Sequence, residues 1–314
     1  MSLYPLFFEP VFKERIWGGE QLKSFGYKLP SNQIGECWAF AAHRNGQSIV
    51  KNGELKGMSL GELWDQHRRL FGNIEGDRFP LLTKILDAAQ DLSVQVHPDD
   101  EYSLEHEGDL GKTECWYIID CDVGAEIIYG HKAQSRAEFE ALIHDGKWDD
   151  LLHKVTVKPG DFFFVPCGTV HAIGKGIVIL ETQQNSDTTY RVYDYDRRDN
   201  EGNLRELHIG QSIAVTTIPS AKIDINPVVE TTGQMKVTRF VESTCFTVYK
   251  WDLGGCAKMK QNHSFQLVSV ISGSGFLAKG DVKYTFKKGD HFMLPSGFGV
   301  FQLEGNAEFI VSHI

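Results

Sequence analysis

Residues 158–174 read KPGDFFFVPCGTVHAIG, and residues 287–303 read KKGDHFMLPSGFGVFQL. Each stretch has a Gly-Asp pair, a short apolar run, a Pro-x-Gly turn and the start of a second run. The matched positions are Gly160 and Gly289, Asp161 and Asp290, Pro166 and Pro295, and Gly168 and Gly297. This spacing predicts the same β-hairpin twice. The first copy has His171 where the second has Val300, so only the first carries a potential metal ligand there.

Short β-rich runs, separated by Gly, Pro and Asp, extend along the chain on both sides of these hairpins. Examples are ECWAFAAH (36–43), LSVQVHP (92–98), KTECWYIID (112–120), GIVILETQQ (176–184), FQLVSVISG (265–273) and AEFIVSHI (307–314). Many short strands with turn signals between them are typical of a sandwich or barrel. We therefore expect a mainly β fold with two β-barrel (jelly-roll) units and a few inserted helices.

Helical patterns are confined to three places. Ser59 with Glu62, and Ser135 with Glu138, have the spacing of a capping box, and apolar residues at helical spacing follow each pair. A third helix is expected within residues 203–216. All three are expected as insertions into a β core.

The Pro-containing segment 219–234 is the expected domain boundary, because only strand patterns follow it. We therefore predict a catalytic domain over residues 1–225, which carries the inserted helices. A second β domain without a metal is predicted over residues 236–314.

Composition limits the classes of function. The chain has 314 residues and 41% hydrophobic content, enough for one large core or two smaller ones. With 32 basic and 42 acidic residues, the net charge of −10 argues against a nucleic-acid or anionic-membrane binder, which needs a basic field. A local basic pocket is still compatible with this total, so small acidic molecules remain candidate ligands.

The cysteines and the apolar segments indicate the cellular compartment. The six cysteines are scattered without a Cys-x-x-Cys pair, as expected for reduced thiols. The N-terminus lacks a basic region ahead of its apolar run, so no signal peptide is expected. The longest uncharged stretches, 162–174 and 264–278, are too short and too rich in Gly or Pro to span a bilayer. We expect a cytoplasmic protein, a monomer or weak homo-oligomer, with no nucleic-acid or membrane partner.

Two strand segments, QVHPD and GKTECW, place polar side chains on shared faces. Residues two apart point to the same side of a strand, so Gln95 lies with His97 and Lys112 lies with Glu114. Taken alone, His97 is more often a core histidine than a ligand. A Lys and a Glu on an apolar strand form a surface pair as readily as a polar site.

The combination of these residues is more specific. His97 is followed by Glu114 and then, after the Pro-x-Gly turn, by His171. This pattern resembles the two consensus motifs of the cupin superfamily, whose small β-barrel holds a metal through His and Glu side chains. With the amide oxygen of Gln95 the set suits Zn²⁺. Without it, two histidines and one carboxylate form the usual site of a non-haem Fe(II) oxygenase. Gln95 favours zinc, because it fills a position that an oxygenase leaves open.

Residues 181–197, ETQQNSDTTYRVYDYDR, end in an alternating Tyr/Arg/Asp strand. Taken alone, Arg191 and Arg197 could pair with Asp187 or Asp194 on the surface, which is the usual fate of such clusters.

Several motifs together resemble type I phosphomannose isomerase in its short bacterial form. They are QVHPD, GKTECWYI, PCGTVHAIG, LETQQNSDTTYRVYDYDR and the following RELH. The segments FKERIWGGEQL, GECWAFAAH and FPLLTKILDA are similar to that family too, so the resemblance spans most of residues 1–215. The second hairpin copy, within residues 236–314, fits the second β domain of the family.

The resemblance implies specific roles. It implies one Zn²⁺ per chain, held by Gln95, His97, Glu114 and His171. It implies catalytic roles for Lys112, Glu181 and Arg191. It implies substrate contacts by Trp17, Lys84, Ser186, Asp187 and Arg197. The chain lacks the large helical insertion of the eukaryotic members, so phosphate contacts from that insertion have no counterpart here.

The implied reaction interconverts mannose 6-phosphate and fructose 6-phosphate. It moves a proton between C1 and C2 through a cis-enediol, so it needs a base and a stabiliser of negative charge. A metal and Arg191 would stabilise that charge. The proton carrier stays open among Glu181, Lys112 and a water at the metal. Arg191 and Arg197 would bind the phosphate.

Two alternative functions share part of this evidence. An Fe(II) cupin dioxygenase would use the same two histidines and carboxylate but would consume O₂. A non-catalytic sugar-binding cupin is the third hypothesis, since Val300 shows that a ligand position can be lost. A pure binder needs no complete ligand set with Lys112 and Arg191.

Overall fold

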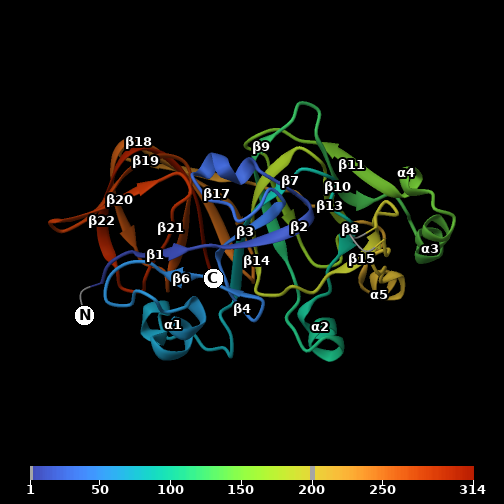
Figure 1. Cartoon of the computed structure of the whole chain (residues 1–314), viewed down its shortest axis with the longest axis horizontal. Helices are drawn as coiled ribbons and strands as arrows, with labels where there is room; N and C mark the ends of the chain where they lie inside the picture. The colour runs from blue at the N-terminus through green and yellow to red at the C-terminus, as the bar shows by residue number, and fades with distance from the viewer. Residues whose placement is uncertain (1–2, 199–201) are drawn as a thin grey trace.

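The computed structural model describes residues 3–198 and 202–314. It consists mainly of antiparallel strands, and Figure 1 shows them gathered into two β units that lie side by side. The C-terminal strands, in orange and red, form most of one unit, and the green and yellow strands form most of the other. This confirms the expected mainly β fold with two barrel-like units and inserted helices.

One nine-stranded sheet forms the C-terminal unit, in the order β16-β17-β18-β22-β19-β21-β1-β6, with β20 paired to β19. The C-terminal strands are β16 (Val228–Thr232), β17 (Met235–Glu242), β18 (Thr247–Gln261), β19 (Gln266–Lys279), β20 (Val282–Lys287), β21 (His291–Leu294) and β22 (Gly299–His313). Two strands from the start of the chain, β1 (Leu6–Glu9) and β6 (Ile49–Val50), complete it. The N-terminal segment is therefore hydrogen-bonded into the C-terminal sheet.

The other unit has two principal sheets. The six-stranded sheet, in the order β12-β9-β14-β7-β3-β2, comprises β2 (Val11–Gly19), β3 (Ile34–Phe40), β7 (Leu81–Ala88), β9 (Glu114–Cys121), β12 (Phe162–Val165) and β14 (Ile177–Gln184). The five-stranded sheet, in the order β11-β10-β13-β8-β15, comprises β8 (Val94–Val96), β10 (Glu126–His131), β11 (Leu152–Thr156), β13 (His171–Ile173) and β15 (Tyr190–Tyr193). A short hairpin of β4 (Ala42–His43) and β5 (Gly46–Gln47) lies beside them.

The helices are short and lie outside the sheets. They are α1 (Leu60–Gln66), α2 (Asp100–His106), α3 (Arg136–His144), α4 (Trp148–Leu151) and α5 (Ile209–Val215), with 3₁₀ helices at Gln21–Phe25 and Arg68–Phe71. The capping box of α1 is confirmed, because Ser59 and Glu62 each accept the other's backbone N–H. Ser135 caps α3 by accepting the Glu138 N–H, but the second capping box is incomplete, because Glu138 accepts the backbone N–H of Gln134 and not that of Ser135.

The third helix is shorter than residues 203–216. It begins only at Ile209, because His208 is held by β15: its backbone N–H donates to the Arg191 carbonyl, and its Nδ1 accepts the Arg191 N–H. The first of these bonds uses the His208 N–H, which an earlier helical turn would need as a donor.

Both copies form a strand, a turn and a second strand, but the prediction of hairpins was wrong, because the two strands of a copy do not pair with each other. β12 pairs with β9, whereas β13 pairs with β8 and β10 in the other sheet. β21 pairs with β1 and β19, whereas β22 pairs with β18 and β19. Gly168 has a φ of +80° and Gly297 a φ of +72°, a left-handed conformation that glycine adopts without steric cost. His171 is buried, whereas Val300 is 45% exposed.

The largest cluster of buried apolar side chains joins the two units. The ring of Phe265, at the start of β19, lies 5.5 Å from that of Phe71 and 5.6 Å from that of Phe79, measured between centroids. All three rings are fully buried. Since this contact links the C-terminal sheet to the first hundred residues, the units share one core in addition to their own.

We predict that Phe265→Ala destabilises the whole chain. Removing a fully buried phenyl ring costs about 3–5 kcal/mol of unfolding free energy. Because the core is shared, urea unfolding followed by circular dichroism should shift as a single transition. Val282→Ala, a control at a side chain that is 53% exposed, should change stability by less than about 0.5 kcal/mol. Two separate transitions, with only one moved by Phe265→Ala, would contradict a shared core.

Candidate active site and metal centre

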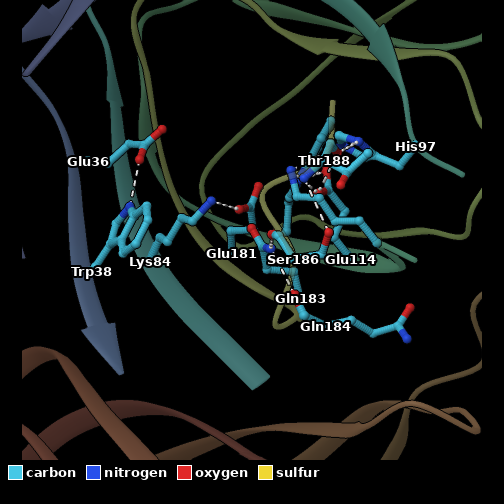
Figure 2. Close-up of polar contacts among 12 residues, drawn as sticks. Glu36, Trp38, Lys84, His97, Glu114, Glu181, Gln183, Gln184, Ser186 and Thr188 are labelled. Carbon is cyan, nitrogen blue, oxygen red and sulfur yellow. Dashed lines mark hydrogen bonds and ion pairs between the residues drawn. The ribbon is translucent and has the colours of Figure 1, made fainter. Parts of the chain in front are cut away.

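Four side chains predicted as ligands converge at the end of one barrel. Gln95 lies in β8 and pairs directly with His171 of β13, while His97 follows β8 and Glu114 begins β9. The Nε2 atoms of His97 and His171 lie 3.4 Å and 3.3 Å from the two oxygens of Glu114. The ligand atoms of these three residues lie within 4.8 Å of one another. Figure 2 shows His97 and Glu114 pointing toward each other.

Both imidazoles are held in the tautomer that a metal requires. Nδ1 of His97 lies 2.9 Å from the Thr188 carbonyl, and Nδ1 of His171 lies 2.8 Å from the Thr169 carbonyl. A carbonyl only accepts, so each Nδ1 donates and each Nε2 keeps its lone pair free. Burial lowers the pKa of His97 to about 3 and also lowers the pKa of His171, which keeps both rings neutral.

Glu114 supplies the negative charge of the cluster and has no exposed surface. One of its oxygens accepts the indole N–H of Trp116 at 3.0 Å. The other, Oε2, is buried and accepts no hydrogen bond. Burial acts to raise the pKa of Glu114, but Lys112 and the two imidazoles hold it well below its usual range.

Lys112 stands beside this cluster. Its Nζ lies 3.3 Å from Oε2 of Glu114 and 3.1 Å from Nε2 of His97. Gln95 presents its amide nitrogen 3.2 Å from Nε2 of His171. A half-turn of that amide would bring its oxygen toward the same point.

These observations fit a metal ion. Two neutral nitrogens and a desolvated carboxylate with an unused oxygen are what Zn²⁺ binds, and the amide oxygen of Gln95 would complete four ligands. Within residues 3–198 and 202–314, no other group of three His, Cys, Asp or Glu side chains meets this description.

A second polar group contains Glu181 and Lys84. Glu181 lies on β14, which pairs with β9, and Lys84 lies on β7, the next strand of the same sheet. The two residues are directly paired between β7 and β14, and their side chains approach to 3.4 Å. Burial, followed by the charge of Glu114, raises the pKa of Glu181 to about 7, although Lys84 opposes this. Oε1 of Glu181 is buried without a hydrogen-bond partner. Figure 2 shows Lys84 reaching toward Glu181.

Glu36 extends this group on the other side of Lys84. Its carboxylate accepts the indole N–H of Trp38 at 2.6 Å and two N–H groups of Arg15 at 3.0 Å each. After burial, which acts to lower the pKa of Lys84, Glu181 and Glu36 have the largest influence and raise it, so the ammonium stays charged.

A cavity of about 400 Å³ connects the two polar groups. Its lining residues are Arg15, Trp17, Glu36, Lys84, Leu86, Leu92, Ser93, Gln95, Lys112, Ile173, Glu181, Asp187, Thr189, Arg191 and Arg205. His97, Glu114 and His171 are not on its surface. They lie directly behind Gln95 and Lys112, which contact them and line the cavity.

Arg191 is the predicted arginine that reaches the cavity. Its Nη1 donates to the Glu206 carbonyl, whereas its Nε is buried without a partner. Arg197 does not line this cavity. It pairs with Asp194 and donates to the Asp91 carbonyl, and it lines a neighbouring hollow with Arg198.

The remaining predicted substrate contacts divide in the same way. Trp17, Lys84 and Asp187 line the cavity. Ser186 does not, because it is fully buried and donates to Asp109 at 3.1 Å. In the same segment, the side-chain amide of Gln183 donates to the backbone carbonyl of Ser186.

Arg15, Glu36 and Arg205 line the cavity and were missed by the sequence analysis. The sequence contained a clue to two of these residues. Arg15 shares a strand face with Trp17, and Glu36 shares one with Trp38, by the two-residue spacing that also places Gln95 with His97. Arg205 had none, since it lies in a loop and reaches the site through an ion pair with Asp194.

No helix of the described part of the chain is long and apolar enough to cross a membrane. All six cysteines are free thiols.

The chain is similar to known proteins along its whole length. Two family models match, phosphomannose isomerase type I, catalytic domain, over residues 6–118, and mannose-6-phosphate isomerase, cupin domain, over residues 236–314. The curated mannose-6-phosphate isomerase ManA of Bacillus subtilis is 62% identical, with 100% of each chain covered. Mannose-6-phosphate isomerase of Streptococcus mutans is 55% identical over 98% of each chain.

A solved structure of a relative has nearly the same fold as this chain. The crystal structure of the mannose 6-phosphate isomerase from Bacillus subtilis has a TM-score of 0.97 and 53% identity, with 99% of each chain covered. Full-length identities of this size, together with the two family models, confirm the resemblance seen in the motifs: the chain is a member of the type I phosphomannose isomerase family.

Proposed function

We propose that this chain interconverts mannose 6-phosphate and fructose 6-phosphate in the cavity between its two polar groups. One observation carries the proposal: in a member of this family, the Lys84–Glu181 pair and three arginines line one cavity, and Gln95 and Lys112 line it directly in front of a buried His-Glu-His cluster. Neither alternative function accounts for this arrangement. An Fe(II) dioxygenase has no need of a buried carboxyl that titrates near neutrality, and a sugar binder needs neither polar group.

The metal would be held by Gln95, His97, Glu114 and His171. When bound, Zn²⁺ supplies Lewis-acid polarisation of the substrate oxygens at C1 and C2. Lys112 lines the cavity beside these ligands, so its ammonium can donate to a substrate oxygen and offset negative charge that develops there.

Glu181 is the proton carrier in this proposal. A carboxyl whose pKa lies near neutrality can take up and release a proton at working pH, and the pKa of Glu181 is about 7. Its side chain lines the cavity, so the carboxylate can take up the proton from C1 or C2 of a bound substrate. Lys84 positions the carboxylate at 3.4 Å and stays charged through both halves of the transfer.

The phosphate end of the substrate would bind at the arginines. Arg191 has a buried Nε without a partner, and Arg205 lines the same cavity. A dianionic phosphate would satisfy these N–H groups and fix the sugar so that C1 and C2 stay near Glu181. Arg197, through its ion pair with Asp194, would hold Arg205 in place.

The wider setting follows from the same observations. Free cysteines throughout suit a reducing compartment, so we propose that the enzyme acts in the cytoplasm. We also propose a monomer or weak homo-oligomer.

Metal removal is the first test. We expect a chelator to abolish isomerisation of fructose 6-phosphate and added zinc to restore it. Glu114→Gln should reduce zinc from about one per chain to nearly none, measured by mass spectrometry of the metal, because it removes the only anionic ligand. Glu54→Gln, at an exposed position, is the matched control and should keep its zinc. Zinc-loaded protein that converts the substrate no faster than buffer with zinc would refute the proposal.

The pH profile tests Glu181. The carboxylate is the base, so kcat/KM should fall as pH decreases through the pKa of Glu181, about 7 in the metal-free chain. Zinc bound at the cluster would offset the negative charge of Glu114, which raises the pKa of Glu181. The acid limb of the zinc-loaded enzyme should therefore lie at or below the pKa of the metal-free chain. Glu181→Gln should lower kcat by about 10²–10⁴-fold and remove the limb. If the variant keeps an unchanged limb, another group carries the proton.

Lys84→Met separates positioning from proton transfer. Lys84 lowers the pKa of Glu181, so removing its charge should raise that pKa and move the acid limb to higher pH. Activity should recover partly at alkaline pH, because the base itself remains. A limb that stays in place while activity falls would show that Lys84 does not act through Glu181.

A further inference from the structure

The second unit has a cavity at the position that corresponds to the active site. In the repeated sequence segment, Val300 occupies the position of His171. Val300 lines a cavity of about 550 Å³. In the first unit, His171 sits in the ligand cluster directly behind the catalytic cavity. The C-terminal barrel therefore keeps a hollow where the other barrel performs chemistry.

One bent strand supplies much of the wall of this cavity. Tyr249 and Trp251 come from the first half of β18, and Met259 comes from its second half. Between them, Gly255 has a φ of +142°, a conformation that a residue with a side chain rarely adopts. The bend allows two aromatic rings and a flexible apolar chain to face one space.

Polar groups in the wall lack partners within the protein. Gln266 is only 5% exposed, and its side-chain amide makes no hydrogen bond within residues 3–198 and 202–314. The indole N–H of Trp251, 4% exposed, is likewise without an acceptor in that part of the chain. Neither group is among the fully buried polar atoms without a partner, so solvent in the cavity reaches both, and they offer three N–H donors and one acceptor to a ligand.

The rim carries charge of both signs. Lys258, Lys260 and Glu230 line it, with His263 at one end. Apolar faces, an unpaired amide and charged groups at the edge together suit a molecule with one apolar face and a ring of hydroxyls. The cavity contains no group of metal-ligating side chains, because His97, Glu114 and His171 are the only such group in the described chain.

We propose that this cavity is a second, non-catalytic site that binds a pyranose ring. The ring's C–H face packs on the partly exposed Tyr249, while the buried Trp251 presents its indole N–H. The sugar's hydroxyls pair with the Gln266 amide and the Trp251 indole N–H. The two lysines can take a phosphate substituent where the sugar carries one.

Tryptophan signals can report the two sites separately. The chain has six tryptophans, of which Trp17 lines the catalytic cavity and Trp251 the second one. In zinc-loaded protein labelled with ¹⁵N-tryptophan, the indole N–H signals are followed by NMR and assigned by Trp→Phe substitution. The probes are 1,5-anhydromannitol and its 6-phosphate, which cannot isomerise because C1 carries no oxygen outside the ring.

We expect the Trp251 signal to saturate with a dissociation constant different from that of Trp17. Similar affinity for both probes would assign the site to the sugar ring alone, and tighter binding of the phosphorylated probe would add the lysines. Gln266→Leu should weaken binding at Trp251 by about tenfold or more and leave Trp17 and kcat/KM unchanged.

Two further variants guard against a folding artefact. Gln302→Leu, the same change at an exposed position of β22, should alter neither titration. Val300→Trp fills the cavity from a side chain that is 45% exposed and should abolish binding at Trp251. The proposal is overturned if the Trp251 signal does not move, or if it moves only in step with Trp17 and ignores both cavity variants.

Discussion

Burial of the Glu114 carboxylate is the constraint on which the first unit depends. An ionised carboxyl without exposed surface is costly unless cations and donors surround it. The Lys112 ammonium and the Trp116 indole N–H stabilise the carboxylate in part. Its Oε2 still accepts no hydrogen bond, and the neighbouring histidines are neutral. A cation between these groups would stabilise all of them at once. Metal binding and the stability of this barrel are therefore expected to be linked.

The same charge sets the behaviour of the second carboxyl. Glu114 has Lys112 at 3.3 Å, and its pKa is lowered, whereas Glu181 shares Lys84 with Glu36 and feels the field of Glu114, so its pKa is raised to about 7. Two carboxyl groups in one site are thus driven to opposite protonation behaviour by their surroundings. This division is the reason we propose metal binding for Glu114 and proton transfer for Glu181. Neither assignment follows from residue type alone.

Local rules predicted what local geometry controls. Glycine and proline spacing predicted the two turns, and the two-residue period of strands placed Gln95 with His97 and Lys112 with Glu114, but neither rule showed that the strands flanking each turn pair with other strands. The full ligand set came from the family resemblance. Arg15 and Glu36 reach the cavity because β2, β3 and β7 lie side by side, and that pairing between distant segments is not encoded at any one position. Family resemblance placed Arg197 and Ser186 near the substrate, but it does not fix side-chain direction: one turns to Asp194 and the other to Asp109.

The second barrel shows why a unit can lose its ligands and keep its fold. The turn before β22 needs Gly297, which has a φ of +72°, but it needs no histidine at position 300. The stability of this unit lies elsewhere, in the Phe265 contacts that complete the shared core and in the pairing of β21 with β1. Trp251 belongs to the buried core of the unit, whereas the partly exposed Val300 lines the cavity beside it. The ligand position is thus separate from the packing that holds the barrel together, so the barrel can keep its fold without a metal.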